Sequence, residues 1–212
     1  AFLIVAGALC VLAFEYNNPA TIGNYSLGGK IQASLFQSVT TRSAGFCTIP
    51  QQNLTDSTAI LSLLFMFIGG SPVGTAGGIK TVTIAVLIAS AVATIRNKDE
   101  VSMFNRAIPQ QAVNKAAAVM SLSLAITLIS MIVLSIVTKA DTFSVMYEAV
   151  SASTTVGFSR ALISTINIWG KIIVIITMYL GRIGPISLLI AFNTRKDNKN
   201  IVRNPKEDIS VG

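Results

Sequence analysis

The stretch Ser153-Thr154-Thr155-Val156-Gly157-Phe158-Ser159 decides the fold, together with a second copy of its centre at Ser43-Ala44-Gly45-Phe46. Each copy follows a short apolar segment, at residues 31–40 in one case and 142–152 in the other. Glycine lets the backbone turn its carbonyl inward, and the aromatic ring can brace the loop from behind. Such loops present backbone carbonyls that replace the water shed by a potassium ion. We therefore expect an ion-binding selectivity filter, which holds potassium at the carbonyls of Ser43, Ala44, Gly45, Phe46, Thr155, Val156, Gly157 and Phe158.

The composition indicates a membrane protein. Of the 212 residues, 52% are hydrophobic and 12% are charged, and the mean hydropathy is +0.67. A soluble domain carries about 25% charged residues. The net charge of +7 does not indicate nucleic-acid binding, because the basic residues lie at the ends of apolar runs. There is no histidine and no disulfide or metal-site pattern of cysteines. We expect no enzymatic activity and no cofactor bound by the chain; a soluble protein with a large buried core is the alternative.

The order of the apolar runs predicts an all-α integral membrane protein with two parallel helix–pore loop–helix repeats, as in a potassium channel. The first repeat covers residues 1–95, and its first helix is read as truncated because the run 1–14 is too short to span a bilayer. A cytoplasmic loop at 96–115 precedes the second repeat at 116–192. A cytoplasmic tail follows at 193–212.

An internal duplication supports these repeats. Gly45-Phe46 recurs as Gly157-Phe158, and Met66 and Gly69 recur at the same offset as Met178 and Gly181. The pore segments match at an offset shorter by one, since the stretch 36–39 corresponds to 147–150. Chance similarity among apolar residues is the alternative, and the shared order and glycine spacing favour duplication.

The distribution of Lys and Arg predicts the orientation. The loop 96–115 and the tail 193–212 hold most of the basic residues, so both are expected on the cytoplasmic side. Lys30, Lys139 and Arg160 are the clear basic residues of the other side. Both pore loops therefore enter from outside.

A glycine-rich interruption divides the second helix of the first repeat. Such a break is tolerated at membrane depth only where it lines water or is covered by protein. A mere kink is one interpretation; the other is a flexible loop below the filter that obstructs the pore, because small residues rearrange without steric cost. The predicted gate consists of Gly69, Gly70, Ser71, Pro72, Gly74, Thr75, Gly77 and Gly78.

Two arginines lie next to the predicted pore. Arg182 occupies the position in the second repeat that Gly70 occupies in the first. We expect its side chain in the cavity below the filter, where it would belong to the gate as an electrostatic barrier to cations. A side chain that reaches the cytoplasmic interface is the alternative. Arg42 precedes Ser43, and we expect it to point behind the filter.

The stretches FQSVTTRSAGF (36–46), LFMFIGGSPVGTAGGIKT (64–81), YEAVSASTTVGFS (147–159) and MYLGRIGPISL (178–188) resemble the second half of Trk/Ktr/HKT potassium transporters, and most of all the Ktr-type membrane subunit. The resemblance implies four fused repeats, of which this chain holds the third and fourth, and a gate at the glycine-rich segment. It also implies a homodimer, a cytosolic nucleotide-binding regulatory ring and possible use of sodium as a coupling ion. The family more often has Phe-Gly ahead of the Thr, where this chain has Ser153-Thr154.

The expected function is therefore potassium uptake across a bacterial plasma membrane by about half of a pore-forming subunit, which needs its missing N-terminal half. Two alternatives stay open. One is a secondary transporter of another solute with a midplane site, although its repeats are usually inverted. The other is a non-transporting membrane subunit of a larger complex.

Overall fold

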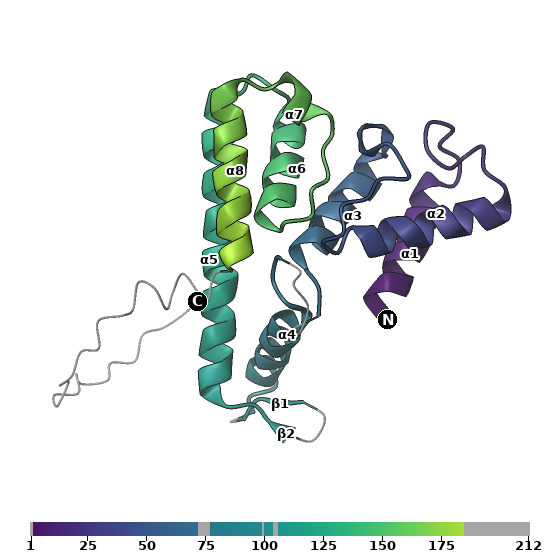
Figure 1. Cartoon of the computed structure of the whole chain (residues 1–212). Helices are drawn as coiled ribbons and strands as arrows, with labels where there is room; N and C mark the ends of the chain where they lie inside the picture. The colour runs from purple at the N-terminus through teal and green to yellow at the C-terminus, as the bar shows by residue number, and fades with distance from the viewer. Residues whose placement is uncertain (1, 72–76, 99, 104–105, 185–212) are drawn as a thin grey trace.

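The computed structural model describes residues 2–71, 77–98, 100–103 and 106–184. The described part is mostly helical, with short connections (Figure 1). In chain order the elements are α1 (Phe2–Glu15), α2 (Leu27–Thr40), the 3₁₀ turn η1 (Gln51–Asn53), α3 (Asp56–Phe67), α4 (Thr81–Ile95), β1 (Ser102–Met103), β2 (Arg106–Ala107), α5 (Gln110–Val137), α6 (Thr142–Ser153), α7 (Leu162–Thr165) and α8 (Ile168–Ile183).

Side-chain caps fix where four of these helices begin. Ser26, Thr55, Asp141 and Asn167 precede α2, α3, α6 and α8, and the side-chain oxygen of each accepts a backbone N–H from the first turn of its helix. Such caps satisfy amide groups that have no partner inside the helix. Both short helices, α2 and α6, are capped in this way, so each has a defined start close to the surface.

The described part is mostly helical, as predicted, and a small hairpin is an addition to that prediction. β1 and β2 form a small antiparallel hairpin inside the predicted loop 96–115, in which Ser102 pairs with Ala107 and Met103 pairs with Arg106. The backbone N–H of Ile108 extends the pairing by donating to the carbonyl of Val101 at 2.7 Å. This segment is too polar to continue α4, and the local pairing satisfies its backbone groups instead.

The helices form two neighbouring groups. In one group α5, α6 and α8 all contact one another, and in the other α1 contacts both α2 and α3. Contacts between α3 and α6 join the groups, and α4 lies along the lower part of α5 (Figure 1). The order helix, short helix, loop, helix therefore occurs twice in space.

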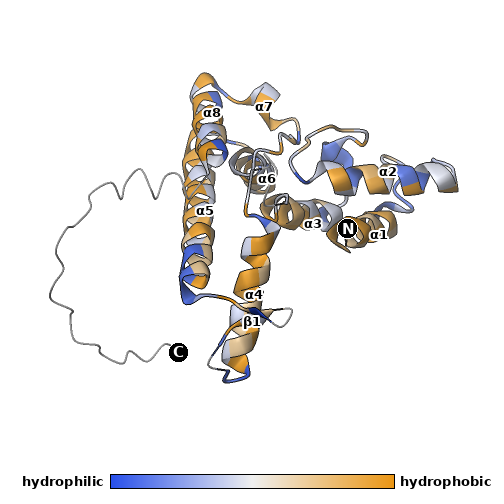
Figure 2. Cartoon of the chain, turned by 60° about the horizontal axis from the view of Figure 1, so that its bottom comes forward, coloured by the Kyte–Doolittle hydropathy of each residue, from blue (hydrophilic) through white to orange (hydrophobic). Residues whose placement is uncertain are grey.

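Among the described residues, α5 is the one helix that is long and apolar enough to cross a membrane, at 28 residues. The helices α1, α3 and α4 are apolar but shorter. Large side chains on α5 and α8 face outward, among them Ile136 at 79% and Trp169 at 67% exposure. In Figure 2 the hydrophobic residues, coloured orange, extend along α4, α5 and α8. Exposed apolar helix surface of this kind suits contact with lipid or with further helices.

The largest hydrophobic core lies where the two groups meet. It includes Ile49 after the first loop, Met66 of α3, Tyr147 of α6 and Phe158 of the second loop, all at or below 1% exposure. A smaller cluster holds α5, α6 and α8 together through Leu134, Val145 and Val174. The core therefore packs directly behind the two loops.

Candidate functional site

The two loops predicted to face a cation lie side by side. A Cβ atom added to Gly45 would collide with the carbonyl oxygen of Val156 and would lie 3.7 Å from the Cα of Gly157. The hydroxyl of Ser43 is 3.4 Å from the carbonyl oxygen of Thr154, to which it donates. The structure thus brings together segments that are more than a hundred residues apart in the chain. Glycine is required at position 45 because the neighbouring backbone leaves no room for a side chain.

The backbone conformations of the two loops match. Ser43 and Gly45 have φ values of 70° and 73°, and their equivalents Thr155 and Gly157 have values of 57° and 92°. A positive φ is uncommon for a non-glycine residue and marked for a β-branched one such as Thr155. Left-handed residues at alternate positions turn successive carbonyls toward one side, whereas in a regular strand they alternate. The strain at Ser43 and Thr155 is of the kind stored at functional sites.

Each loop is held by the last turns of the short helix that precedes it. The Oγ1 of Thr40 in α2 accepts the N–H of Phe46 and donates to the carbonyl of the same residue, both at 2.8 Å. In α6 the Oγ of Ser151, the residue equivalent to Thr40, accepts the N–H of Gly157 at 3.1 Å. The sequence analysis missed both hydroxyls; their place one turn ahead of each loop was the available signal.

The same two helices end next to the loops. Both α2 and α6 end within three residues of a loop, at Thr40 and Ser153. The carboxyl end of a helix carries a partial negative charge of about half an elementary charge. Together with the backbone carbonyls and the hydroxyls of Ser43 and Thr155, these helix ends offer a monovalent cation an oxygen-lined, negative environment.

The aromatic residues of the two loops differ. Phe158 is 1% exposed and packs in the large core with Val156 and Tyr147, so it braces its loop from behind as predicted. Phe46 is 72% exposed, and the prediction that its ring braces the first loop is wrong for this chain. The hydroxyl of Thr40 binds the backbone of Phe46 instead. Ala44 is also exposed, so the first loop presents an open side.

The two ends of the glycine-rich interruption, residues 67–70 and 79–81, are joined by backbone hydrogen bonds and form what is called the neck below. Where α3 ends, Gly69 donates its N–H to the carbonyl of Ile79 at 2.9 Å, and Ile79 donates to Phe67 at 3.1 Å. Thr81 donates to Gly70 at 3.2 Å, so that the two ends of the interruption pair as a short parallel bridge. The predicted gate residues Pro72, Gly74 and Thr75 lie outside the described residues. The described members Gly69, Gly70, Ser71, Gly77 and Gly78 lie at the two ends of the interruption.

Both ends of this segment contact the loops. The N–H of Gly77 donates to Oγ1 of Thr155 at 3.1 Å, and a side chain at Gly77 would collide with that atom. At the other end, Nη2 of Arg42 donates to the carbonyl of Gly69 at 2.9 Å. The group that Arg42 binds is therefore a main-chain carbonyl of the glycine-rich segment.

Helix α8 closes the other side of the site. A Cβ atom at Gly181 would collide with the carbonyl oxygen of Ser153, so the backbone of α8 lies against the end of α6. Arg182 follows in the last turn of α8 and is exposed in this chain. Its predicted place in the cavity below the filter and its role in a gate stay predictions.

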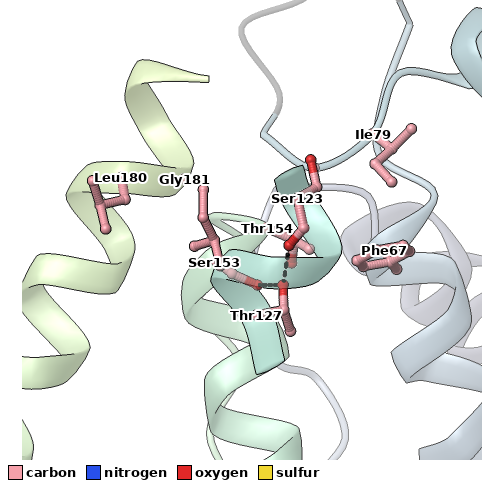
Figure 3. Close-up of a pocket in the computed structure, with 10 residues that line it drawn as sticks. Phe67, Ile79, Ser123, Thr127, Ser153, Thr154, Leu180 and Gly181 are labelled. Atoms are coloured by element: carbon pink, nitrogen blue, oxygen red, sulfur yellow. Dashed lines mark hydrogen bonds between the residues drawn. The ribbon is translucent and has the colours of Figure 1, made fainter. Parts of the chain in front are cut away.

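A small cavity lies where these elements meet, with a volume of about 20 Å³, which is room for one water molecule. Its polar wall is formed by the hydroxyls of Thr127 and Ser153. The Oγ1 of Thr127 lies 2.9 Å from Oγ of Ser153, to which it donates, and also 2.9 Å from the carbonyl oxygen of Ser123. Figure 3 shows these hydroxyls opposite Phe67 and Ile79 at the neck of the glycine-rich segment.

The chain is similar in sequence to several known proteins. The chain is 36% identical over 204 residues to the Ktr system potassium uptake protein B of Bacillus subtilis (strain 168), a match that covers 96% of this chain and 45% of the relative. It is 32% identical over 210 residues to the protein of the same name from Vibrio alginolyticus, with coverage of 99% and 46%. It is 30% identical to the potassium/sodium uptake protein NtpJ of Enterococcus hirae, with coverage of 100% and 48%. The chain spans about half the length of these curated relatives.

The fold has a solved counterpart. The crystal structure of the potassium transporter TrkH from Vibrio parahaemolyticus superposes with a TM-score of 0.78, at 21% identity, over 91% of this chain and 43% of that one. The family described as cation transport protein, TrkH, matches residues 3–203. The chain, with its paired loops and its two matching helix groups, belongs to the TrkH family of cation transport proteins.

Proposed function

We propose that this chain forms half of a pore for potassium uptake across the plasma membrane, in which loops 43–46 and 155–158 are two parts of one selectivity filter. One observation carries the proposal: the equivalent residues of the two loops share the same left-handed conformations and lie in contact. A filter made of backbone carbonyls replaces the hydration shell of the ion. The curated relatives, which are named as potassium uptake proteins, support the choice of potassium.

The pore needs further loops to surround the ion. Potassium filters use about four, and this chain supplies two. The exposed Phe46 and Ala44 lie on the open side of the first loop, where a neighbour would cover them. We infer that an N-terminal half of the same subunit supplies the other two loops, and that the two halves are helix–pore loop–helix repeats of one orientation.

The glycine-rich segment is proposed as the gate. Two hydrogen bonds support this proposal: Gly77 donates to the hydroxyl of Thr155 in the second loop, and Arg42, which precedes the first loop, donates to the carbonyl of Gly69. Arg182 would add a positive charge at the same level and would oppose cation passage. Opening then requires these contacts to break.

The assembly and the membrane placement are also proposals. The pair of repeats, bounded at 1–95 and 116–192, would lie in a bacterial inner membrane with the loop 96–115 and the tail 193–212 in the cytoplasm. The tail lies outside the described residues. A second copy of the subunit would complete a homodimer, and a cytosolic nucleotide-binding ring would regulate it from the basic side. Sodium is the proposed candidate for a coupling ion.

Growth of a potassium-uptake-deficient bacterium on low potassium tests the function. The full-length gene should restore growth, and Gly45→Asp and Gly157→Asp should each abolish it. A side chain at Gly45 would collide with the carbonyl oxygen of Val156, and a carboxylate at either position would bind the ion too tightly to release it. Gly28→Asp is the matched control, because an added Cβ there meets nothing within 4 Å. Restored growth with all three variants would contradict the proposed filter.

The alternatives predict other outcomes. A secondary transporter of another solute would show saturable uptake of that solute and no potassium current. A non-transporting subunit would leave potassium uptake unchanged on its own. The contact between equivalent loops, with the carboxyl ends of two helices beside it, favours the pore.

A further inference from the structure

We propose that Gln51 is a positioning residue that fixes the spacing between the two filter loops, and that Gln51, with Gln37 and Tyr147, sets the preference for potassium over sodium. These residues, called the Gln51 clamp below, lie behind the loops and do not touch the ion path. The inference rests on the proposed function, since it assigns a role within the same filter.

The clamp connects three elements through one amide. The Oε1 of Gln51, in η1, accepts Nε2 of Gln37 in α2 at 2.9 Å and the hydroxyl of Tyr147 in α6 at 3.0 Å. The Nε2 of Gln51 donates to the carbonyl of Ile49 at 2.8 Å and to Oε1 of Gln37 at 3.3 Å. Both oxygen lone pairs and both amide hydrogens of Gln51 are thus used.

The clamp is buried in the core. Gln37 and Tyr147 are 0% exposed, and Gln51 is 3% exposed. Tyr147 packs there among Ile49, Val156 and Phe158. A buried polar group that loses its partner costs more than the bond itself gave, because water cannot replace the partner. The Gln51 amide therefore has one favourable position, which Gln37 and Tyr147 define together.

Each partner of Gln51 lies one turn before a residue that holds a loop. Gln37 precedes Thr40, which binds both backbone groups of Phe46. Tyr147 precedes Ser151, which accepts the N–H of Gly157. The clamp is a direct hydrogen-bonded connection between the two helices, so a change at Gln51 alters their separation and with it the separation of the loops.

Loop separation matters for ion choice in either account of filter selectivity. If the size of the cage decides, the separation sets that size; if the number and field of the carbonyls decide, the separation sets how many reach the ion. Sodium is smaller than potassium and is better accommodated when the carbonyls can close in. A loosened clamp should therefore admit more sodium.

The experiment measures sodium competition in the full-length subunit. Rubidium uptake into proteoliposomes is recorded against increasing potassium and, separately, increasing sodium, for Tyr147→Phe and Gln51→Met. Tyr147→Phe removes one hydroxyl and leaves the ring in the core. Gln51→Met keeps the length of the side chain and removes every bond of the clamp. The matched controls are Tyr179→Phe, at an exposed tyrosine of α8, and Gln52→Met, at the exposed neighbour of Gln51.

The ratio of half-inhibiting sodium to half-inhibiting potassium should fall about three- to tenfold in Tyr147→Phe, the effect of one lost hydrogen bond. It should fall at least as far in Gln51→Met, while the controls keep the wild-type ratio. The double variant should show no more loss than Gln51→Met alone, since both act through the same amide.

An unchanged ratio in both variants, with only lower protein yield or melting temperature, would overturn the inference, because a purely structural role does not change ion preference. Wild-type protein that takes up no rubidium or potassium would overturn the proposed function and this inference with it. Selective uptake by the wild type with unaltered variants would overturn the inference alone.

Discussion

The backbone N–H of Gly77 donates a hydrogen bond to the side-chain hydroxyl of Thr155 at 3.1 Å. In the proposed filter this hydroxyl is a candidate ion ligand, and the bond directs the positive end of an amide dipole at it. In the proposed closed state of the pore, this hydrogen bond holds the end of the glycine-rich segment against the second filter loop.

Gly77→Ala should weaken closure. A Cβ at this position collides with Oγ1 of Thr155 and leaves no room against the carbonyl of Thr154. Loss of the docked position should raise rubidium flux through the unstimulated full-length protein about three- to tenfold. Gly28→Ala, in open space, is the control. Equal or lower flux in Gly77→Ala would contradict a blocking role for the contact.

Arg182→Ala should increase potassium flux at low voltage. A fixed positive charge near the ion path opposes cations, and its removal lowers that barrier. The control is Arg160→Ala, on the opposite side of the predicted membrane domain, where the guanidinium lies over the ring of Phe143. An unchanged rate and an unchanged potassium affinity in Arg182→Ala would refute a role for this residue in the pore.

Thr40→Val and Ser151→Ala should each weaken potassium binding. Both changes leave a loop amide, of Phe46 or of Gly157, without its acceptor, at a cost of about 1–3 kcal/mol. The half-saturating potassium concentration should rise about fivefold or more. Ser135→Ala, at an exposed serine of α5, should leave it unchanged. If half-saturation is the same in all three, the hydroxyls do not hold the filter.

Glu15→Gln should destabilise the protein. The carboxylate is 0% exposed and accepts from Asn18 and from the hydroxyl of Thr21 at 2.7 and 2.6 Å. It also accepts the N–H and the hydroxyl of Thr55 at 2.9 and 2.8 Å, which connects the end of α1 to the start of α3. A glutamine would point N–H groups at these donors. We expect a loss of about 1–3 kcal/mol in the free energy of unfolding, measured in detergent against the exposed Glu100→Gln.

Cys47 reports the sidedness of the loops. It is exposed just after the first loop, whereas Cys10 lies in α1. A membrane-impermeant thiol reagent should modify Cys47 from outside the cell in a Cys10→Ser background. The surrounding protein atoms partly desolvate the thiol and raise its pKa above the ordinary value of 9.0, so the reactive thiolate is scarce at neutral pH. Labelling should therefore accelerate as the pH rises toward and past that value. Labelling only from the cytoplasmic side would reverse the predicted orientation.

The sequence predicted local features well, because glycines, caps and apolar runs act over a few residues. The start of α8 at Ile168 and the end of α5 at Val137 agree with the predicted runs, and the short segments before both loops are helices. The predicted end of the last helix, near residue 192, lies outside the described residues. α5 begins at Gln110, earlier than predicted, because the prediction followed the apolar run and its first turns are polar. In those turns the side-chain amide of Gln110 donates a hydrogen bond to the side chain of Asn114, one turn later.

Interactions between distant segments were not predictable from one sequence. The pairing of Gln37 with Gln51, the target of Arg42 and the outward position of Phe46 all depend on which helices meet. Glutamine, arginine and phenylalanine accept many environments, so their types alone do not indicate a partner. Gly45 differs from these residues, because its position accepts only glycine. Its φ is positive, and the neighbouring backbone leaves no room for a side chain.

The neck between α3 and α4 is closed by main-chain atoms of Phe67, Gly69, Gly70, Ile79 and Thr81. No side-chain atom takes part in those bonds, so a change of side chain within the insert does not by itself remove any of them. The insert can therefore vary in sequence while the paired ends keep α3 and α4 joined. An engineer could graft a foreign sensor peptide at the same point.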